Sequence, residues 1–267
     1  MNHIPRLYEP MLSDHLKANR QMAFVSGPRQ VGKTTIARRL STSYQSWDAT
    51  FLRRWNALRK AQLLREDLRD LTRVFEVEHI SILASFLENR SGDPLVYASL
   101  ARDVQASENT IRNWVSVLNS LHYGFSVKPW YRNVENAIRK TPKWYLRDWS
   151  GIEDAGSRNE TLVACHLLKA VEGWTDIGIG AYDLHYIRDK QKREVDFLVT
   201  RNRKPWFVVE VKTSDTHLSP ALARMQTATG ATHAFQVVMS LPFVEADCFG
   251  TTKPVIVPAR TFLSQLP

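Results

Sequence analysis

Three charged side chains stand in two segments that are otherwise apolar. Asp196 lies in Glu-Val-Asp-Phe-Leu-Val-Thr, and Glu210 and Lys212 lie in Trp-Phe-Val-Val-Glu-Val-Lys-Thr. Both segments are rich in β-branched and aromatic residues, and Arg201–Pro205 between them has the composition of a turn, so the sequence predicts an antiparallel hairpin. A turn centred on that segment sets Asp196 across from the region of Val209 and Glu210. Glu210 and Lys212 project together because side chains two apart on a strand share a face.

This arrangement predicts a metal-dependent site. Charged side chains in apolar strands usually have a charged partner or a bound metal. A carboxylate pair suits a hard cation such as Mg²⁺, and a nearby lysine can orient a water or stabilise a phosphate. Asp196, Glu210 and Lys212 are therefore candidate catalytic residues, and the alternative is a salt-bridged edge hairpin without catalysis. The pattern Asp, spacer, Glu-x-Lys resembles the active-site strand pair of restriction-endonuclease-like nucleases.

A second candidate site is a phosphate-binding loop near the N-terminus. Gly27 to Thr34 fits G-x-x-x-x-G-K-[ST] and lies between an expected strand at 22–25 and an expected helix that ends at Leu40. Backbone N–H groups of such a loop turn toward the phosphates, Lys33 adds a positive charge, and the Thr34 hydroxyl can ligate Mg²⁺. The predicted ATP-binding residues are Gly27, Gln30, Val31, Gly32, Lys33, Thr34 and Thr35.

Efficient ATP hydrolysis is not expected from this chain. A P-loop ATPase needs a second apolar strand that ends in an acidic residue, which holds Mg²⁺. No run of four apolar residues ending in an acid occurs between Leu40 and Pro94. One strand and one helix also cannot form the several-stranded parallel sheet that carries such loops. The loop is therefore expected to bind nucleotide without turnover, or to be vestigial.

Residues 95–132 have the spacing of a helix-turn-helix. The expected helices are Ser99–Val104 and Glu108–Leu121, with Ser107 as the N-cap of the second, and two short strands at 123–127 and 130–133 would form a wing. The alternative to DNA contact is packing against another domain or a protein partner. The candidate DNA-contacting residues are Asn109, Arg112 and Asn113 on the second helix, and Lys128 and Arg132 on the wing.

The elements expected around the hairpin alternate between strand and helix. The sequence predicts strands at 144–146 and 183–188, a helix at 157–172, and after the hairpin a helix at 219–229 and a strand at 232–239. The predicted fold class is α/β with several domains. They are a truncated P-loop segment at 1–48, a helical and winged-helix domain at 49–142, and a restriction-endonuclease-like domain with a mixed sheet at 143–267.

The composition indicates which binding partners and which cellular compartment to expect. The net charge of +9 favours nucleic acid. No apolar run approaches the roughly 20 residues of a membrane span, and the first residues lack the features of a signal peptide. Cys165 and Cys248 have no CxxC partner, which argues against a disulfide framework or a zinc site and fits a cytoplasmic protein. The sequence gives no indication of oligomeric state.

The order of these motifs resembles that of the prokaryotic predicted AAA-type ATPases that end in a restriction-endonuclease-like domain of unknown function. The resemblance rests on the phosphate loop, the helix-turn-helix and six short segments. In chain order these are Trp47-Asp48, Asp148-Trp149-Ser150-Gly151, Asn159-Glu160-Thr161-Leu162-Val163, Tyr186-Ile187-Arg188-Asp189, Glu194-Val195-Asp196-Phe197 and Glu210-Val211-Lys212. It implies ATP binding, and it marks Glu160 as a metal ligand beside Asp196 and Glu210, with Gln226 as a weaker candidate. The chain departs from the family because the portion with the acidic Mg²⁺ strand is missing after Asp48.

Three functional hypotheses follow from the sequence. The first is an ATP-binding protein of the AAA-like type that carries winged-helix and nuclease-like domains and lacks efficient hydrolysis. The second is a Mg²⁺-dependent DNA endonuclease that uses Asp196, Glu210 and Lys212. The third is an inactive, truncated remnant that acts as a protein- or DNA-interaction module.

Overall fold

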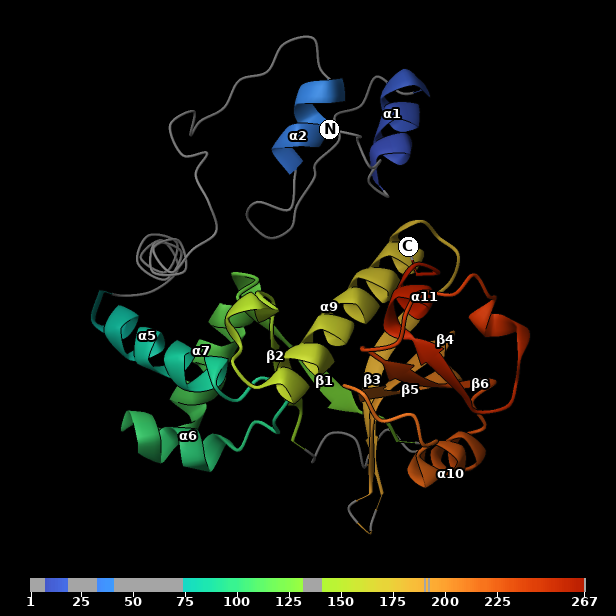
Figure 1. Cartoon of the computed structure of the whole chain (residues 1–267). Helices are drawn as coiled ribbons and strands as arrows, with labels where there is room; N and C mark the ends of the chain where they lie inside the picture. Colours follow the sequence, from blue (N-terminus) through green and yellow to red (C-terminus); the bar gives the residue numbers. More distant parts are fainter. Residues whose placement is uncertain are drawn as a thin grey trace.

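The computed structural model describes residues 8–18, 33–40, 74–131, 141–189, 191 and 193–266. The fold is mixed α/β, with helices in the N-terminal half and a seven-stranded sheet in the C-terminal half (Figure 1). The helices are α1 (Tyr8–Ala18), α2 (Lys33–Leu40), α5 (Val74–Glu88), α6 (Tyr97–Val104), α7 (Glu108–Ser120), α9 (Ala155–Asp176), α10 (Pro220–Thr229) and α11 (Ala259–Leu263). The strands are β1 (Gly124–Pro129), β2 (Lys143–Leu146), β3 (Tyr182–Arg188), β4 (Glu194–Arg201), β5 (Lys204–Lys212), β6 (His233–Val238) and β7 (Val255–Pro258).

The sheet has the strand order β2-β1-β3-β4-β5-β6-β7. The pairs β1–β2, β3–β4 and β4–β5 are antiparallel, whereas β1–β3, β5–β6 and β6–β7 are parallel. The fold class and the mixed sheet predicted from the sequence are therefore confirmed. The last strand, β7, and the short helix α11 were not predicted.

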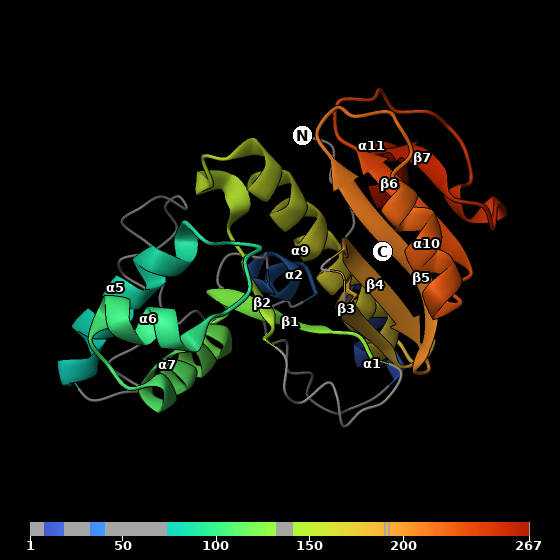
Figure 2. The same ribbon diagram turned by 90° about the horizontal axis from the view of Figure 1, so that it is seen from below.

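Both faces of the sheet are covered by helices, which explains why its central strands are almost continuously apolar. Phe207 and Val209 of β5 pack in the cluster that contains α9 and α11, whereas Val208 between them packs with Leu222 and Met225 of α10. Alternate side chains of one strand thus enter opposite layers of core. Figure 2 shows α9 and α10 on the two sides of β4 and β5.

The predicted hairpin is present and its turn is tighter than expected. β4 and β5 are antiparallel, and Phe197 is opposite Val209, as the sequence indicated. Only Asn202 and Arg203 lie between the strands, and both have positive φ angles of 51° and 65°. Positive φ at both central positions is typical of the two-residue turn whose twist matches that of the flanking strands.

The helix-turn-helix is also confirmed. α6 and α7 are separated by residues 105–107, and Ser107 caps α7 by accepting a hydrogen bond from the Thr110 N–H at 3.1 Å. The helices α5, α6 and α7 share a core cluster that extends to Trp144 of β2. The indole N–H of Trp144 donates to Asn119 Oδ1 at 2.9 Å, which fastens α7 to that strand.

The wing differs from the prediction. Its first strand, β1, pairs with β2, which begins at Lys143. Of the second strand predicted at 130–133, Trp130 and Tyr131 are not in a strand, and residues 132 and 133 lie outside the described residues. β1 also pairs in parallel with β3 through Lys128 and His185. The sheet therefore runs across the domain boundary predicted at 142/143, because β1 and β2 lie on opposite sides of it in the sequence.

The N-terminal elements are described in part. The helix α2 begins at Lys33 and corresponds to the predicted helix that ends at Leu40. The expected strand at 22–25, the loop residues Gly27, Gln30, Val31 and Gly32, and the segment 41–73 lie outside the described residues. The Tyr8 hydroxyl of α1 donates to Asp176 of α9 at 3.0 Å, so α1 contacts the end of that long helix.

In the described part of the chain, no helix combines the length and the apolar character needed to cross a bilayer.

The N-cap of α7 gives a direct test of the helix-turn-helix. Replacing Ser107 by Ala removes the acceptor for an N–H group in the first turn, so we expect Ser107→Ala to lower the free energy of unfolding by about 1 kcal/mol. Urea denaturation followed by circular dichroism measures this change. Ser116→Ala, at an exposed position in the same helix, is the matched control and should change stability little. Equal effects of the two substitutions would contradict the cap.

Candidate functional site

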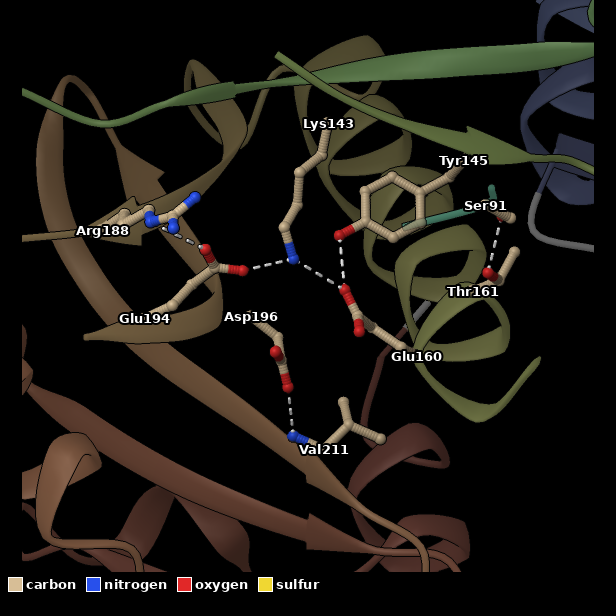
Figure 3. A network of polar contacts seen from close by, with 9 residues as sticks. All are labelled: Ser91, Lys143, Tyr145, Glu160, Thr161, Arg188, Glu194, Asp196 and Val211. Carbon is tan, nitrogen blue, oxygen red and sulfur yellow. Dashed lines mark hydrogen bonds and ion pairs between the residues drawn. The ribbon is translucent and has the colours of Figure 1, made fainter. Parts of the chain in front are cut away.

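The candidate site lies where β4 and β5 separate. The ladder between the two strands ends at the pair Phe197–Val209. Beyond it, Asp196 fills the opening, and its Oδ2 accepts a hydrogen bond from the Val211 N–H at 2.7 Å (Figure 3). A carboxylate held by a backbone N–H has a fixed orientation, so Asp196 points to one place between the two strands.

An irregularity in β4 directs Asp196 to this opening. On β3 the paired residues His185 and Ile187 are two positions apart, whereas their partners on β4, Leu198 and Val195, are three apart. One extra residue therefore lies in β4 at this point, as in a β-bulge. Val195 consequently packs with α10 although Phe197 packs with α9, whereas regular alternation would put both on one face. Asp196 lies within the bulge and leaves the regular alternation.

The Glu-x-Lys pair behaves as the sequence predicted. Glu210 and Lys212 project together, and Lys212 Nζ donates to Glu210 Oε1 at 2.7 Å. Glu210 is only 8% exposed. Its second oxygen, Oε2, is buried and has no hydrogen-bond partner. An unpaired carboxylate oxygen in a buried position is costly, and such atoms often mark a place for a ligand or an ion.

A buried lysine, Lys143, connects β2 to α9 and β4 at the site. Lys143 of β2 is 4% exposed, and its Nζ lies 3.1 Å from Glu160 Oε1 of α9 and 2.5 Å from Glu194 Oε1 of β4. The Tyr145 hydroxyl donates to the same Glu160 oxygen at 2.8 Å. Arg188 Nε is 3.7 Å from the other oxygen of Glu194. Figure 3 shows the Lys143 ammonium between the two glutamates.

The helix α9 is held in place from both ends of the site. Asp154 caps its first turn by accepting from the Ser157 N–H, and Asn159 donates to Thr213 Oγ1 just after β5. On the other side, the Thr161 and Ser91 hydroxyls are hydrogen bonded at 2.8 Å, and Ser91 Oγ accepts from the backbone of β2. These contacts fix Glu160, which lies between them, relative to β2 and β5.

Charge crowding shifts the acid–base behaviour of the two central carboxyl groups. Burial, and then the carboxylates of Glu160 and Glu210, raise the pKa of Asp196 well above its ordinary value. Burial also raises the pKa of Glu210, although the Lys212 ammonium opposes this. Burial by itself lowers the pKa of Lys143, but Glu160 and Glu194 outweigh burial and hold that pKa above its ordinary value. The site therefore combines a cationic lysine with carboxyl groups that resist ionisation.

The donor set at Asp196 and Glu210 fits a hard divalent cation. Both are carboxylates, and Glu210 Oε2 is a buried oxygen that lacks a partner. Among the described residues, no three His, Cys, Asp or Glu side chains form a ready group of metal ligands. Mg²⁺ does not need such a group, because it commonly keeps several waters and binds through one or two carboxylates. Glu160, also predicted as a ligand, is instead engaged by Lys143 and Tyr145.

Gln226 lies away from this site. Its amide donates to the backbone carbonyls of Thr232 and Thr252. Thr232 precedes His233, which is in register with Phe207, whereas Glu210 is in register with Gln236. Gln226 therefore lies toward the other end of β5. The buried Gln236 is the residue that supports the site here, because it donates to the carbonyl groups of Asp215 and His217 in the segment that follows β5.

The other predicted site residues are placed as follows. Asn109, Arg112 and Asn113 are exposed on α7, and Lys128 is exposed on β1. The Arg112 guanidinium stacks on the Tyr97 ring at 3.9 Å and lies 3.9 Å from Glu108. Arg132 lies outside the described residues. Thr35 is exposed in the first turn of α2, and the side chains of Lys33 and Thr34 are outside what the structure describes.

Three members of the site were not predicted from the sequence. Lys143 opens a strand whose other residues are Trp, Tyr and Leu, and Glu194 begins the strand of Asp196. In both cases a charge beside an apolar run was the available indication, as it was for Glu210. Tyr145 gave no such indication, because a buried tyrosine in an aromatic strand is ordinary core.

Two segments of the chain match known families. Residues 155–243 match a domain of unknown function, DUF4143. This domain is often found in AAA-like ATPase proteins. Residues 41–153 match a second domain of unknown function, DUF8612. Lys143 and Tyr145 thus come from the DUF8612 segment, and Glu160, Glu194, Asp196 and Glu210 come from the DUF4143 segment.

The relatives found by sequence are themselves without a described activity. Uncharacterized proteins of Mycobacterium bovis and Mycobacterium tuberculosis are each 27% identical to this chain over 175 residues. The match covers 59% of this chain and 40% of each relative, so the chain spans less than half of their length. No solved structure matches the chain.

The raised pKa of Asp196 predicts that replacing its carboxylate by a neutral group increases the stability of the protein, by an amount that depends on pH. The folded chain binds this proton more tightly than the unfolded chain. The contribution of Asp196 protonation to stability is therefore fully present below the unfolded pKa of about 4, and it is lost as the pH rises through the raised folded pKa. Asn cannot titrate and keeps an oxygen for the Val211 N–H. We expect Asp196→Asn to be more stable than the wild type at pH 8 by about 1 kcal/mol or more, and the gain to shrink toward pH 4.

Urea denaturation at several pH values, with a chelator present, measures this gain. Asp183→Asn, at an exposed position on β3, is the matched control and should show little pH-dependent difference from the wild type. A variant that is no more stable than the wild type at pH 8 would show that Asp196 is not under charge stress.

Proposed function

We propose that this chain is a nucleotide-binding protein of the AAA-like ATPase type, which binds ATP through Gly27–Thr34 and does not hydrolyse it efficiently. Its winged helix and its restriction-endonuclease-like domain are the parts that act on partners. The motif G-x-x-x-x-G-K-[ST] supports the proposal, as does the frequent occurrence of DUF4143 in AAA-like ATPase proteins. The absence of a second, acid-ending strand from the sequence supports binding without turnover.

The observation that carries this proposal is the starting point of α2. This helix begins at Lys33, so the last two residues of the motif form its first turn. The first N–H groups of a helix have no partner within the helix and carry the positive end of its dipole, which favours a phosphate. Gly27, Gln30, Val31, Gly32, Lys33, Thr34 and Thr35 are the proposed nucleotide-binding residues. Thr34 would also ligate the Mg²⁺ that accompanies ATP.

ATP binding is tested by removing the charge of Lys33. A hydrogen bond to a charged group contributes about 1.5–3 kcal/mol, so Lys33→Ala should weaken the binding of a fluorescent ATP analogue by roughly 10- to 100-fold. Lys17→Ala, at an exposed position of α1, is the matched control and should bind like the wild type. Hydrolysis by the wild type should not exceed background. Equal affinity of the Lys33 and Lys17 variants would overturn the proposal, and strong Mg²⁺-dependent turnover would overturn its second half.

A second candidate function is Mg²⁺-dependent cleavage of DNA by the restriction-endonuclease-like domain. The specific observation in its favour is the buried, unpartnered Glu210 Oε2 beside Asp196 and Lys212. Asp196 and Glu210 would hold the cation, which when bound activates a water and neutralises charge on the phosphate. Lys212 carries a positive charge next to Glu210 and is 34% exposed, so it can reach a phosphate at the surface.

DNA as the substrate is supported by charge and by the neighbouring winged helix. The chain carries a net charge of +9, which favours a polyanion. Asn109, Arg112, Asn113 and Lys128 are exposed on the helix-turn-helix and its wing. Because β1 and β2 of the wing belong to the same sheet as β4 and β5, a duplex held by the winged helix would be held at a fixed position relative to Asp196. The alternative is that this surface binds a protein.

Cleavage is tested with supercoiled and single-stranded DNA in Mg²⁺ or Mn²⁺. A bound metal ion stabilises the transition state by several kcal/mol, so Asp196→Asn should reduce cleavage by about 100-fold or more. Asp183→Asn is again the matched control and should cut like the wild type. If Asp196→Asn still cleaved DNA like the wild type, the hairpin would not be the cleavage site. No cutting by the wild type would favour the interaction-module hypothesis for this domain.

A further inference from the structure

The feature that goes beyond the proposed functions is the buried ammonium of Lys143. It is contributed by β2, in the segment that matches DUF8612, whereas the acids around it come from the DUF4143 segment. Its side chain is 6% exposed and contacts Glu160 of α9 and Glu194 of β4 at once. A buried ammonium of this kind requires compensating carboxylates, so these three residues form one electrostatic unit.

The position of Lys143 decides which carboxylates remain for a metal ion. Glu160 Oε1 already receives the Lys143 ammonium and the Tyr145 hydroxyl. Glu194 has an ion pair on each oxygen, with Lys143 on one and Arg188 on the other. Both acids are therefore largely neutralised within the protein. A cation placed against them would have to compete with an ammonium that is already in contact with both.

Asp196 and Glu210 are less neutralised by protein groups than Glu160 and Glu194 are. Asp196 Oδ2 is held by a neutral backbone N–H, and Glu210 keeps a buried oxygen without a partner. Among the described residues, the ion pair made by these two carboxylates is the one between Glu210 Oε1 and Lys212. Two carboxylates suffice for a Mg²⁺ or Mn²⁺ ion that keeps part of its water shell. The arrangement therefore offers a place for one divalent cation beside a site already occupied by an ammonium.

We propose that Lys143 serves as a built-in cation that occupies the place of a second metal ion, so that the site takes up a single divalent cation at Asp196 and Glu210. Glu160 is then a partner of Lys143 and does not ligate the metal. Two-metal phosphodiesterases hold their ions about 3.5–4 Å apart. Here the second positive charge is supplied by the chain itself. Lys143 is a positioning residue in this proposal, and the inference rests on the divalent-cation site of the second proposed function.

The experiment is a Mn²⁺ titration of the whole chain without nucleotide, followed by the electron paramagnetic resonance signal of free Mn²⁺. We expect the wild type to bind about one Mn²⁺ and Asp196→Asn to lose it. Glu160→Gln should still bind about one Mn²⁺ and lose far less affinity than Asp196→Asn, because Glu160 is not a ligand. Lys143→Met frees Glu160 and Glu194 and should raise the stoichiometry to about two. Lys204→Met, at an exposed position of the hairpin, is the matched control and should stay at about one.

The outcomes separate this inference from the function on which it rests. Two ions bound by the wild type, or loss of binding in Glu160→Gln as severe as in Asp196→Asn, would overturn the role of Lys143 while leaving the cation site intact. A folded Lys143→Met variant that still binds one ion would do the same. No Mn²⁺ bound by the wild type would overturn both. If circular dichroism shows that Lys143→Met does not fold, the wild-type stoichiometry and Glu160→Gln decide the question.

Discussion

The arrangement of this protein depends on the cost of burying charge. Lys143, Glu160 and Glu194 come from a strand, a helix and another strand, and the buried Lys143 requires the two partly buried glutamates to compensate its charge. Their mutual neutralisation fixes β2, α9 and β4 in one arrangement. The aromatic core beneath them is connected to this arrangement, since the Tyr145 ring of β2 packs against Phe197 of β4 and its hydroxyl donates to Glu160. The apolar packing and the ion pairs thus fix the same three elements.

The wing and the strands that carry the carboxylate site are parts of one sheet. β1 pairs with β2 on one side and with β3 on the other, and Trp144 connects the same sheet to α7. The candidate DNA-binding helix and the carboxylate site are consequently joined by hydrogen-bonded strands rather than by a flexible linker. The site itself is assembled from both matched domains of unknown function, so neither segment holds the complete constellation.

The site also carries strain of an electrostatic kind. The separation of β4 and β5 after Phe197 leaves room for Asp196, and the bulge in β4 points it there. Burial and neighbouring carboxylates then act against ionisation of Asp196 and Glu210. Active and binding sites commonly hold groups under this kind of stress, because a ligand of opposite charge relieves it on binding. This is the physical link between the fold and the proposed cation site.

The elements whose cause is local could be predicted from the amino-acid sequence. The hairpin of β4 and β5, the pairing of Glu210 with Lys212, the helix-turn-helix and the Ser107 cap all follow from side-chain alternation, turn composition and capping within a few residues. Only the tertiary structure decided which distant charges meet. Lys143 and Glu194 are separated by some fifty positions, and their contact requires β1 to pair with both β2 and β3. The bulge at Asp196 depends on the pairing of β4 with β3, because register is set between strands and not within one.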